Sequence, residues 1–259
     1  MQLVLSLFSG IGLLDKAFKE AGFCVVSAGD IILGNHFDIR DFAAPKNKFD
    51  GIIAGSPCQD FSRANRDRPA TNDFYGLQML REFKRVVLEA SPTWWLLENV
   101  PNVPNVKIDG YSYQRIDINQ SWFDVVNRLR HIQFGHKENK YIQIPRAVTV
   151  PGIKYKSCAL ASDDRTFKEL LELQGLDCDF DIPSFNVKGK KRAVGNGVPL
   201  SVGRVLAKSV TDLDTLSVTS QHIKYCKCDC KRIVTHRGQF FDFSCRKRYQ
   251  RSKDINYVI

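Results

Sequence analysis

Long apolar segments are missing from this chain of 259 residues. No apolar run approaches the roughly 20 residues that a helix needs to cross a bilayer, so we predict no membrane span. Residues 1–8 are apolar, but they have neither a basic segment before them nor a cleavage site after them, which favours a first β-strand over a signal peptide. We therefore expect a cytoplasmic protein in a reducing compartment.

A disulfide framework is also absent. Eight cysteines would suit paired bridges in a small secreted domain, but here four lie close together near the C-terminus and four are scattered. The scattered ones are Cys24, Cys58, Cys158 and Cys178. This distribution favours reduced thiols, and it leaves one metal site and one catalytic cysteine as candidates.

Acidic residues are scarce in the last part of the chain. Residues 222–259, the tail, contain ten Lys and Arg against three Asp, so they carry +7 of the total net charge of +10. Such a basic segment favours a polyanionic partner, whereas the plainer alternative is a solvated tail that only aids solubility. A hydrophobic content of 43% is enough for one large α/β domain with a small appendage.

Strands and helices alternate through the first half of the chain. Apolar runs that predict strands lie at residues 2–8, 23–28, 49–54, 94–97 and 130–134. Amphipathic patterns predict helices at residues 13–21 and 76–89. This alternation is typical of a parallel sheet covered on both faces, which binds ligands at the carboxyl ends of its strands. The polar or reactive residues at those ends are Ser9, Asp30, Cys58 and Glu98.

Periodicity weakens between residues 136 and 183, where prolines interrupt a mildly basic segment that we interpret as a small separate lobe. A turn at Gly195-Asn196-Gly197 and a helix over residues 202–209 follow it. Residues 212–223 resemble a linker to the tail, and we find no internal repeat.

Two residues are the strongest chemical candidates when taken alone. Cys58 follows a proline at the end of a buried strand, where a thiol can be exposed and partly ionised; the alternative is a structural cysteine. Glu98 directly follows an apolar run, so it either caps the next segment or lies in a poorly solvated pocket with a raised pKa. The turn over residues 9–12 suits close approach to a ligand, but many α/β proteins have such turns.

Five short motifs occur in a fixed order. They are Leu7-Phe8-Ser9-Gly10-Ile11-Gly12, Gly55-Ser56-Pro57-Cys58-Gln59, Glu98-Asn99-Val100, Asn127-Arg128-Leu129-Arg130 and Gly195-Asn196-Gly197-Val198-Pro199. In this order they resemble the cytosine-C5 DNA methyltransferases over residues 1–208, and the compact size is similar to that of phage-type members. The resemblance implies an α/β fold with a Rossmann-like, S-adenosylmethionine-dependent methyltransferase sheet, a small recognition lobe and a zinc-knuckle-like C-terminal appendage.

The resemblance also implies a reaction. Cys58 is expected to add to C6 of cytosine while Glu98 contacts N3 and the exocyclic amine, which makes C5 nucleophilic toward a methyl group. Arg128 and Arg130 match the paired arginines expected to hold the base O2 and support Glu98. The base must leave the duplex, and residues 59–68 resemble the loop that closes behind it.

The same resemblance implies the S-adenosylmethionine site. Its expected residues are Phe8, Ser9, Gly10, Gly12, Asp30, Asp38, Pro57, Asn196 and Val198. Asp30 is expected to bind the ribose hydroxyls and Asp38 the adenine amine. Three features depart from the family pattern: Leu13 replaces a glycine, only seven residues separate the two acids, and Val126 replaces a glutamine.

The resemblance divides the chain as follows. Residues 1–135 and 186–211 would form the catalytic domain, residues 136–185 a short target-recognition lobe, and residues 222–259 the basic, Cys-rich tail. The expected partner is double-stranded DNA, bound by a monomer in a restriction-modification or phage setting. The alternatives are methylation of cytosine in tRNA, a catalytically silent DNA-binding protein, and transfer of a group other than methyl.

The tail holds a C-x-C-x-C-x14-C array formed by Cys226, Cys228, Cys230 and Cys245. Four thiolates are suitable ligands for structural zinc, and His236 is a substitute for one of them. Reduced thiols without a metal are the alternative. With residues 246–248 beside it, such a knuckle would make a non-specific clamp on DNA phosphates.

Overall fold

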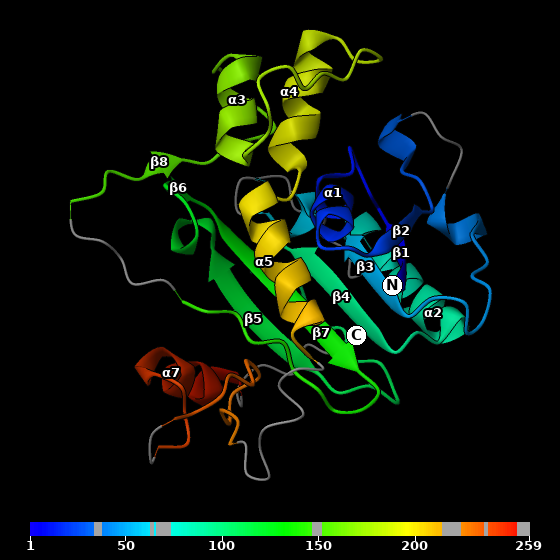
Figure 1. Ribbon diagram of the computed structural model, residues 1–259, viewed down its shortest axis with the longest axis vertical. Helices are drawn as coiled ribbons and strands as arrows, with labels where there is room; N and C mark the ends of the chain where they lie inside the picture. The colour runs from blue at the N-terminus through cyan, green and yellow to red at the C-terminus, as the bar shows by residue number, and fades with distance from the viewer. Residues whose placement is uncertain are drawn as a thin grey trace.

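A six-stranded sheet forms the centre of the fold (Figure 1), in the order β2-β1-β3-β4-β7-β5. The computed structural model describes residues 1–33, 38–62, 65, 74–146, 152–213, 224–235 and 238–252. The strands are β1 (Leu3–Leu7), β2 (Cys24–Ser27), β3 (Gly51–Gly55), β4 (Trp94–Asn99), β5 (Gln114–Asn119) and β7 (Leu129–His136). The strands β2, β1, β3 and β4 are parallel, whereas β7 runs antiparallel to both β4 and β5.

The sheet is therefore mixed, which corrects the prediction of an all-parallel sheet. The five apolar runs correspond to β1, β2, β3, β4 and β7, but the sequence reasoning missed β5. In β5 buried residues alternate with partly exposed ones, as at a sheet edge. Between β5 and β7 lie only the 3-10 helix η4 (Gln120–Trp122) and β6 (Val126–Asn127), because antiparallel neighbours need no crossover helix.

Helices cover both faces of the sheet (Figure 1). Helices α1 (Leu13–Glu20) and α5 (Leu200–Thr211) pack on one face and touch each other, while α2 (Tyr75–Ala90) packs on the other. The core is tight where strands carry tryptophan. A Cβ on Gly51 would lie 2.1 Å from the Trp94 ring, and one on Gly135 would lie 2.4 Å from Trp95, so both positions need glycine.

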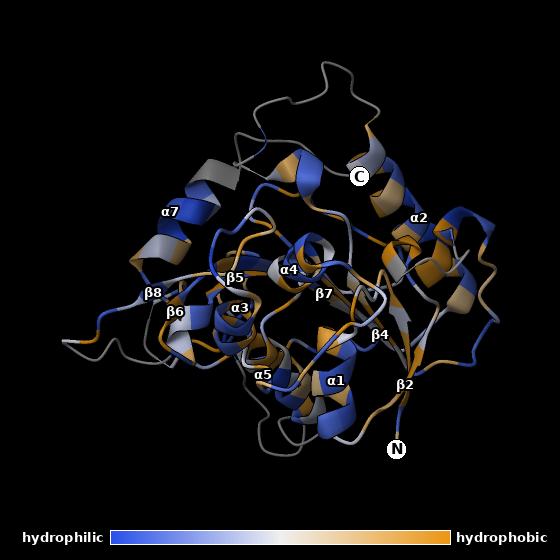
Figure 2. Ribbon diagram, turned by 90° about the horizontal axis from the view of Figure 1, so that it is seen from above, coloured by the Kyte–Doolittle hydropathy of each residue, from blue (hydrophilic) through white to orange (hydrophobic). Residues whose placement is uncertain are grey.

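The lobe that we predicted without periodicity contains regular structure. It has α3 (Phe167–Gln174) and β8 (Lys156–Ser157), which pairs with β6 of the preceding segment. Helix α4 (Val187–Asn196) follows the lobe and packs against α3. Thr166 and Glu169 form a capping box at the start of α3, a signal that could have been read from the sequence. Gly195 and Asn196 end α4, so the predicted turn begins only at Gly197. Figure 2 shows that the outer sides of α3 and α4 are hydrophilic.

The described part of the tail packs beside β5, at the end of the molecule away from α3 and α4 (Figure 1). It contains a β-bridge between Tyr225 and Ile233 and the helix α7 (Phe243–Ser252). Its four cysteines belong to the same buried cluster as Ile116, Phe134 and Val202 of the main core. The tail is thus part of the core rather than a detached appendage. Among the described residues, no helix is long and apolar enough to cross a membrane.

Candidate active site

One cavity of about 720 Å³ lies where the parallel strands end. Its lining brings together ten of the predicted site residues: Phe8, Ser9, Gly10, Asp30, Asp38, Pro57, Cys58, Glu98, Asn196 and Val198. Gly12, Arg128 and Arg130 stay outside this lining as far as the described residues define it. The volume falls within the range of about 300–1,000 Å³ that is usual for small-molecule and cofactor sites.

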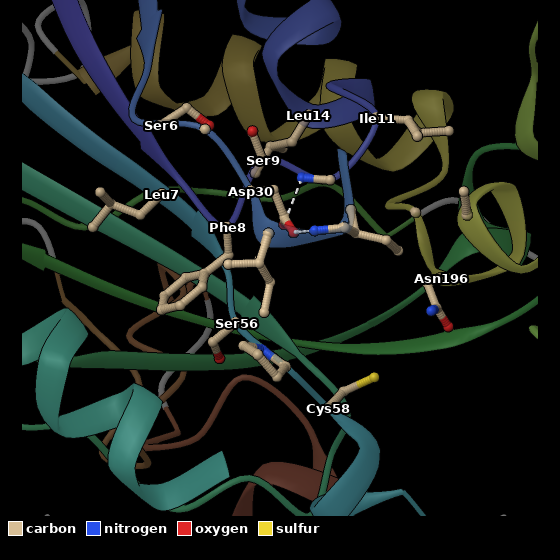
Figure 3. Close-up of a pocket in the computed structure, with 18 of the residues that line it drawn as sticks. Ser6, Leu7, Phe8, Ser9, Ile11, Leu14, Asp30, Ser56, Cys58 and Asn196 are labelled. Carbon is tan, nitrogen blue, oxygen red and sulfur yellow. Dashed lines mark hydrogen bonds between the residues drawn. The ribbon is translucent and has the colours of Figure 1, made fainter. Parts of the chain in front are cut away.

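The turn after β1 shapes one wall of the cavity (Figure 3). Phe8, Gly10 and Gly12 all have left-handed backbone conformations, with φ values of 53°, 54° and 76°. The Gly12 N–H closes the turn by donating to the Ser9 carbonyl at 2.8 Å. A left-handed phenylalanine is uncommon, and its retention here places the Phe8 ring and the first turn of α1 at the cavity.

The two predicted acids both face this cavity despite their short separation in sequence. Asp30 accepts from the backbone N–H groups of Gly10 and Ile32, each at 2.9 Å, and so joins the end of β2 to the turn after β1 (Figure 3). Asp38 accepts from the backbone and guanidinium of Arg40, which lower its pKa to about 2. The 3-10 helices η1 (Ile31–Leu33) and η2 (Ile39–Asp41) flank residues 34–37, which lie outside the described residues.

Leu13, the residue that replaces an expected glycine, packs against the opposite wall. A Cβ on Gly197 would lie 2.6 Å from Leu13 Cδ1. The side chain of Leu13, directly after the first motif, therefore fits because Gly197 in the last motif has no side chain. This contact also ties the N-terminus of α1 to the segment that carries Asn196 and Val198.

Cys58 lies at the start of the 3-10 helix η3 (Gln59–Phe61), directly after β3. The turn that presents it is held by Asn99, whose amide donates to the Ser56 hydroxyl at 2.7 Å and to the Ser56 carbonyl at 3.1 Å. Sequence reasoning quoted Asn99 within a motif but missed this role; its position next to Glu98 was the available signal. Asp60 accepts from the Gly76 N–H at 2.7 Å and fixes the start of α2.

Glu98 lies in a poorly solvated pocket, so the cap alternative for this residue is wrong. It is 7% exposed, and burial raises the pKa of its carboxyl against the opposing charges of Arg130 and Arg128. Arg130 Nε lies 2.8 Å from Glu98 Oε1. Burial also raises the pKa of Cys58, and the charge of Glu98 raises it further. Burial in the folded protein therefore works against ionisation of this thiol, whereas its position at a strand end favoured partial ionisation.

Arg128 makes different contacts from Arg130. Its guanidinium donates to the carbonyls of Gly195 at 2.7 Å and Gly197 at 3.3 Å, and also to that of Ala159. Burial lowers the pKa of Arg128, and the charge of Arg130 lowers it further. Arg128 therefore ties the lobe to the end of α4, while Arg130 is the arginine that contacts Glu98. Within the described part of the chain, Arg128 Nε has no hydrogen-bond partner.

The four tail cysteines form a second candidate site. Their sulfurs all lie within 4.8 Å of one another, and successive pairs are 3.4, 3.2 and 3.7 Å apart. Four thiolates around zinc, with Zn–S distances of about 2.3 Å, lie about 3.8 Å from one another. The donor set and its spacing therefore fit zinc. His236 and the arginines of the predicted closing loop, Arg63, Arg66 and Arg68, lie outside the described residues.

Comparisons with known proteins agree with this geometry. Residues 3–108 match the sequence model of the C-5 cytosine-specific DNA methylase family. The type II methyltransferase M.FnuDI of Fusobacterium nucleatum is 37% identical over 111 residues, which are 38% of this chain and 32% of that protein. The orphan methyltransferase M.SPRI of Bacillus phage SPR is 30% identical over 169 residues, covering 52% of this chain and 38% of that protein. The matched part thus spans about a third of these relatives.

Solved structures share the fold. A mutant of DNMT2 from Spodoptera frugiperda gives a TM-score of 0.57 with 16% identity, covering 82% of this chain and 100% of that chain. A prophage-encoded putative DNA modification methyltransferase of E. coli gives 0.57 with 17% identity, covering 83% and 100%. The fold is that of an α/β methyltransferase. Residues 3–108, which match the C-5 cytosine-specific DNA methylase family, include Cys58 and Glu98, and both of these residues line the cavity.

Proposed function

We propose that this protein transfers a methyl group from S-adenosylmethionine to C5 of cytosine in double-stranded DNA, acting as a monomer. The observation that carries the proposal is that Cys58 and the buried acid Glu98 face one cavity that also contains Asp30 and Asp38. The relatives named as type II methyltransferases support the same activity. Since the chain covers only part of those relatives, the activity is proposed from the site itself.

The charge of the cavity fits the cofactor. Among the described residues, its acidic lining residues are Asp15, Asp30, Asp38, Asp60 and Glu98, against one basic residue, Arg192. S-adenosylmethionine, when bound, supplies an electrophilic methyl group on a sulfonium cation, which an acid-rich cavity favours. We assign the ribose hydroxyls to Asp30 and the adenine amine to Asp38. The turn over residues 8–12 approaches the cofactor on one side and Pro57, Asn196 and Val198 enclose it on the other.

Cys58 and Glu98 would act together. Burial first, and then the charge of Glu98, raises the pKa of Cys58, so a negative Glu98 opposes ionisation of the sulfur. When Glu98 holds a proton and hydrogen-bonds it to N3 of cytosine, that opposition is removed, and the sulfur ionises by releasing its own proton to solvent. The thiolate then adds to C6 while the Glu98 proton passes to N3, and C5 becomes nucleophilic. After methyl transfer C5 loses its proton, and the bond to Cys58 breaks.

Arg130 keeps Glu98 in place during these steps through its 2.8 Å contact. Neither side chain can reach a base inside a duplex, so the cytosine must be flipped into the cavity. We propose residues 1–135 and 186–211 as the catalytic domain that receives the base. Residues 136–185 would be the lobe that selects the site on DNA, and Arg128 would join the two through Ala159 and Gly195.

Trapping on a mechanism-based substrate tests this function. DNA containing 5-fluorocytosine cannot lose its C5 substituent, so it should form a covalent adduct with the protein that survives denaturation. The adduct should require S-adenosylmethionine, persist in Cys178→Ala, an exposed-cysteine control, and vanish in Cys58→Ala. An equal adduct with Cys58→Ala, or methyl transfer to tRNA but not to DNA in parallel assays, would overturn the proposal.

We also propose that the four tail cysteines hold one structural zinc ion. Buried thiols so close together would repel one another if ionised, and a divalent cation removes that repulsion. Purified protein should contain one zinc per chain, and Cys228→Ser should lose it. If the native protein were purified without zinc and a chelator left its melting temperature unchanged, the site would consist of four buried reduced thiols, and the proposal would be wrong.

A further inference from the structure

The described part of the tail, which carries the four clustered cysteines, makes several contacts with β5 and with the segment around Gln143. The Arg115 N–H on β5 donates to the Asp229 carbonyl at 2.7 Å. Gln143 donates to the Lys231 carbonyl at 3.1 Å and accepts from the Ile233 N–H at 2.9 Å. These contacts use the backbone edge of β5 and the segment beside it, so the tail occupies the position that a further strand would take.

Arg115 continues this connection toward the active site. Its guanidinium donates to the Pro101 carbonyl at 2.7 Å and to the Val103 carbonyl at 3.3 Å, and it also contacts Asn105. The loop that it holds, residues 100–106, begins immediately after the Glu98-Asn99 pair. Arg115 thus hydrogen-bonds the tail through its backbone and the loop that follows Glu98 through its side chain.

A second connection runs through α7. Arg248 lies 3.4 Å from Asp117, and Asp117 accepts from the buried His131 ring at 2.8 Å. His131 is the neighbour of Arg130 on β7, and Arg130 contacts Glu98. Gln133, also on β7, accepts from the Val106 N–H at 2.7 Å and donates to the Pro104 carbonyl at 2.8 Å. Both connections therefore end at Glu98, one through its following loop and one through its arginine.

We propose that the tail is a positioning element for Glu98 and Arg130, rather than a clamp on DNA phosphates. This proposal rests on the proposed methyl transfer. It makes Arg248 and Gln143 positioning residues, which act on catalysis only through other residues. Of the three consecutive basic residues on α7, Arg246 and Lys247 are exposed, whereas Arg248 is turned toward Asp117. A clamp on DNA phosphates would use the exposed Arg246 and Lys247, whereas a positioning element would use Arg248.

The test compares two double variants that leave every cysteine in place. Gln143→Ala with Arg248→Gln removes three contacts that join the tail to Gln143 and to Asp117 of β5. Lys247→Gln with Gln250→Ala changes two exposed residues of the same helix. Hydrogen exchange is measured at the amides of Val103 and Val106, which are hydrogen-bonded within or to the loop.

We expect the first variant to exchange at these amides about tenfold faster than wild type, with one zinc still bound. Its kcat should fall about tenfold, while the KM values for DNA and S-adenosylmethionine stay within about twofold. The control variant should match wild type in both measurements. Unchanged exchange and kcat in the first variant, or a raised KM for DNA in the control, would overturn the proposal. Hydrogen exchange can be measured without enzymatic activity. If the wild-type protein methylated no substrate, the proposed function would be rejected, and the exchange data alone would still test whether the tail positions the loop after Glu98.

Discussion

The cavity at the carboxyl ends of β1, β3 and β4 and the edge strand β5 hold their polar groups differently. At the cavity, Glu98 and Cys58 are held with raised pKa values and with contacts that leave part of each group available. At β5, the buried Gln114 has its amide and carbonyl bonded on both sides, to Ile142 and Cys230. One region keeps polar groups ready for a ligand, and the other uses them to join segments.

This difference shows where function and stability are separated in the fold. A buried acid that is poorly solvated costs stability, and proteins keep such groups where chemistry needs them. A buried amide with satisfied partners contributes stability and specifies one arrangement of neighbouring segments. Substitutions at the cavity and at β5 should therefore change activity and stability in different directions.

The strongest contrast is expected for Glu98→Gln. The amide cannot donate a proton to N3, so the rate of methyl transfer should fall about 10³-fold, within the usual range for a lost general acid. At the same time the protein should become more stable at pH 8. Melting curves and steady-state rates on the same preparation measure both effects.

The sign of the stability change follows from the raised pKa. The carboxyl of Glu98 binds its proton more tightly in the folded state than in the unfolded chain. Wild-type stability therefore falls as pH rises through the folded-state pKa of Glu98, whereas the glutamine variant has no such loss. The gap in melting temperature should shrink toward pH 5. A variant less stable than wild type at pH 8 would show that the Arg130 contact outweighs desolvation.

Sequence reasoning predicted the cavity half of the molecule well. Its strands are continuous apolar runs, and the candidate residues Cys58 and Glu98 come at or just after strand ends, so their position at the cavity could be predicted from the sequence. Leu13 could be recognised as a departure, but its contact with Gly197 joins residues far apart in the chain and needs the fold.

The β5 half could not be predicted in the same way. The residues of β5 are Gln-Arg-Ile-Asp-Ile-Asn, whose polar side chains hide a strand that is completed by the tail. Gln114 looks like a surface residue in sequence, yet it is fully buried. Its partners Ile142 and Cys230 lie 28 and 116 residues away. The different roles of Arg128 and Arg130 likewise depend on which backbone carbonyls lie nearby.

Gln114→Leu should lower the stability of the protein without changing the cavity. The leucine fills a similar volume but leaves the Ile142 and Cys230 backbone groups without partners, so the free energy of unfolding should fall by about 2–3 kcal/mol. Denaturant titration measures it, with the exposed Gln250→Leu as control. S-adenosylmethionine affinity should stay unchanged, because Gln114 is not among the residues that line the cavity. Loss of that affinity without loss of stability would contradict the separation.

The smallest effect is expected for Asp30→Ala, which sharpens the comparison inside the cavity. The change removes the proposed acceptor for the ribose hydroxyls and frees the Gly10 N–H of the turn after β1. The Kd for S-adenosylmethionine should rise about tenfold, or about 1.4 kcal/mol, as measured by calorimetry. Asp41→Ala, an exposed acid in η2 that does not line the cavity, is the matched control. If both variants weaken binding equally, the cavity attracts the cofactor through its overall negative charge, and Asp30 has no specific contact with the ribose.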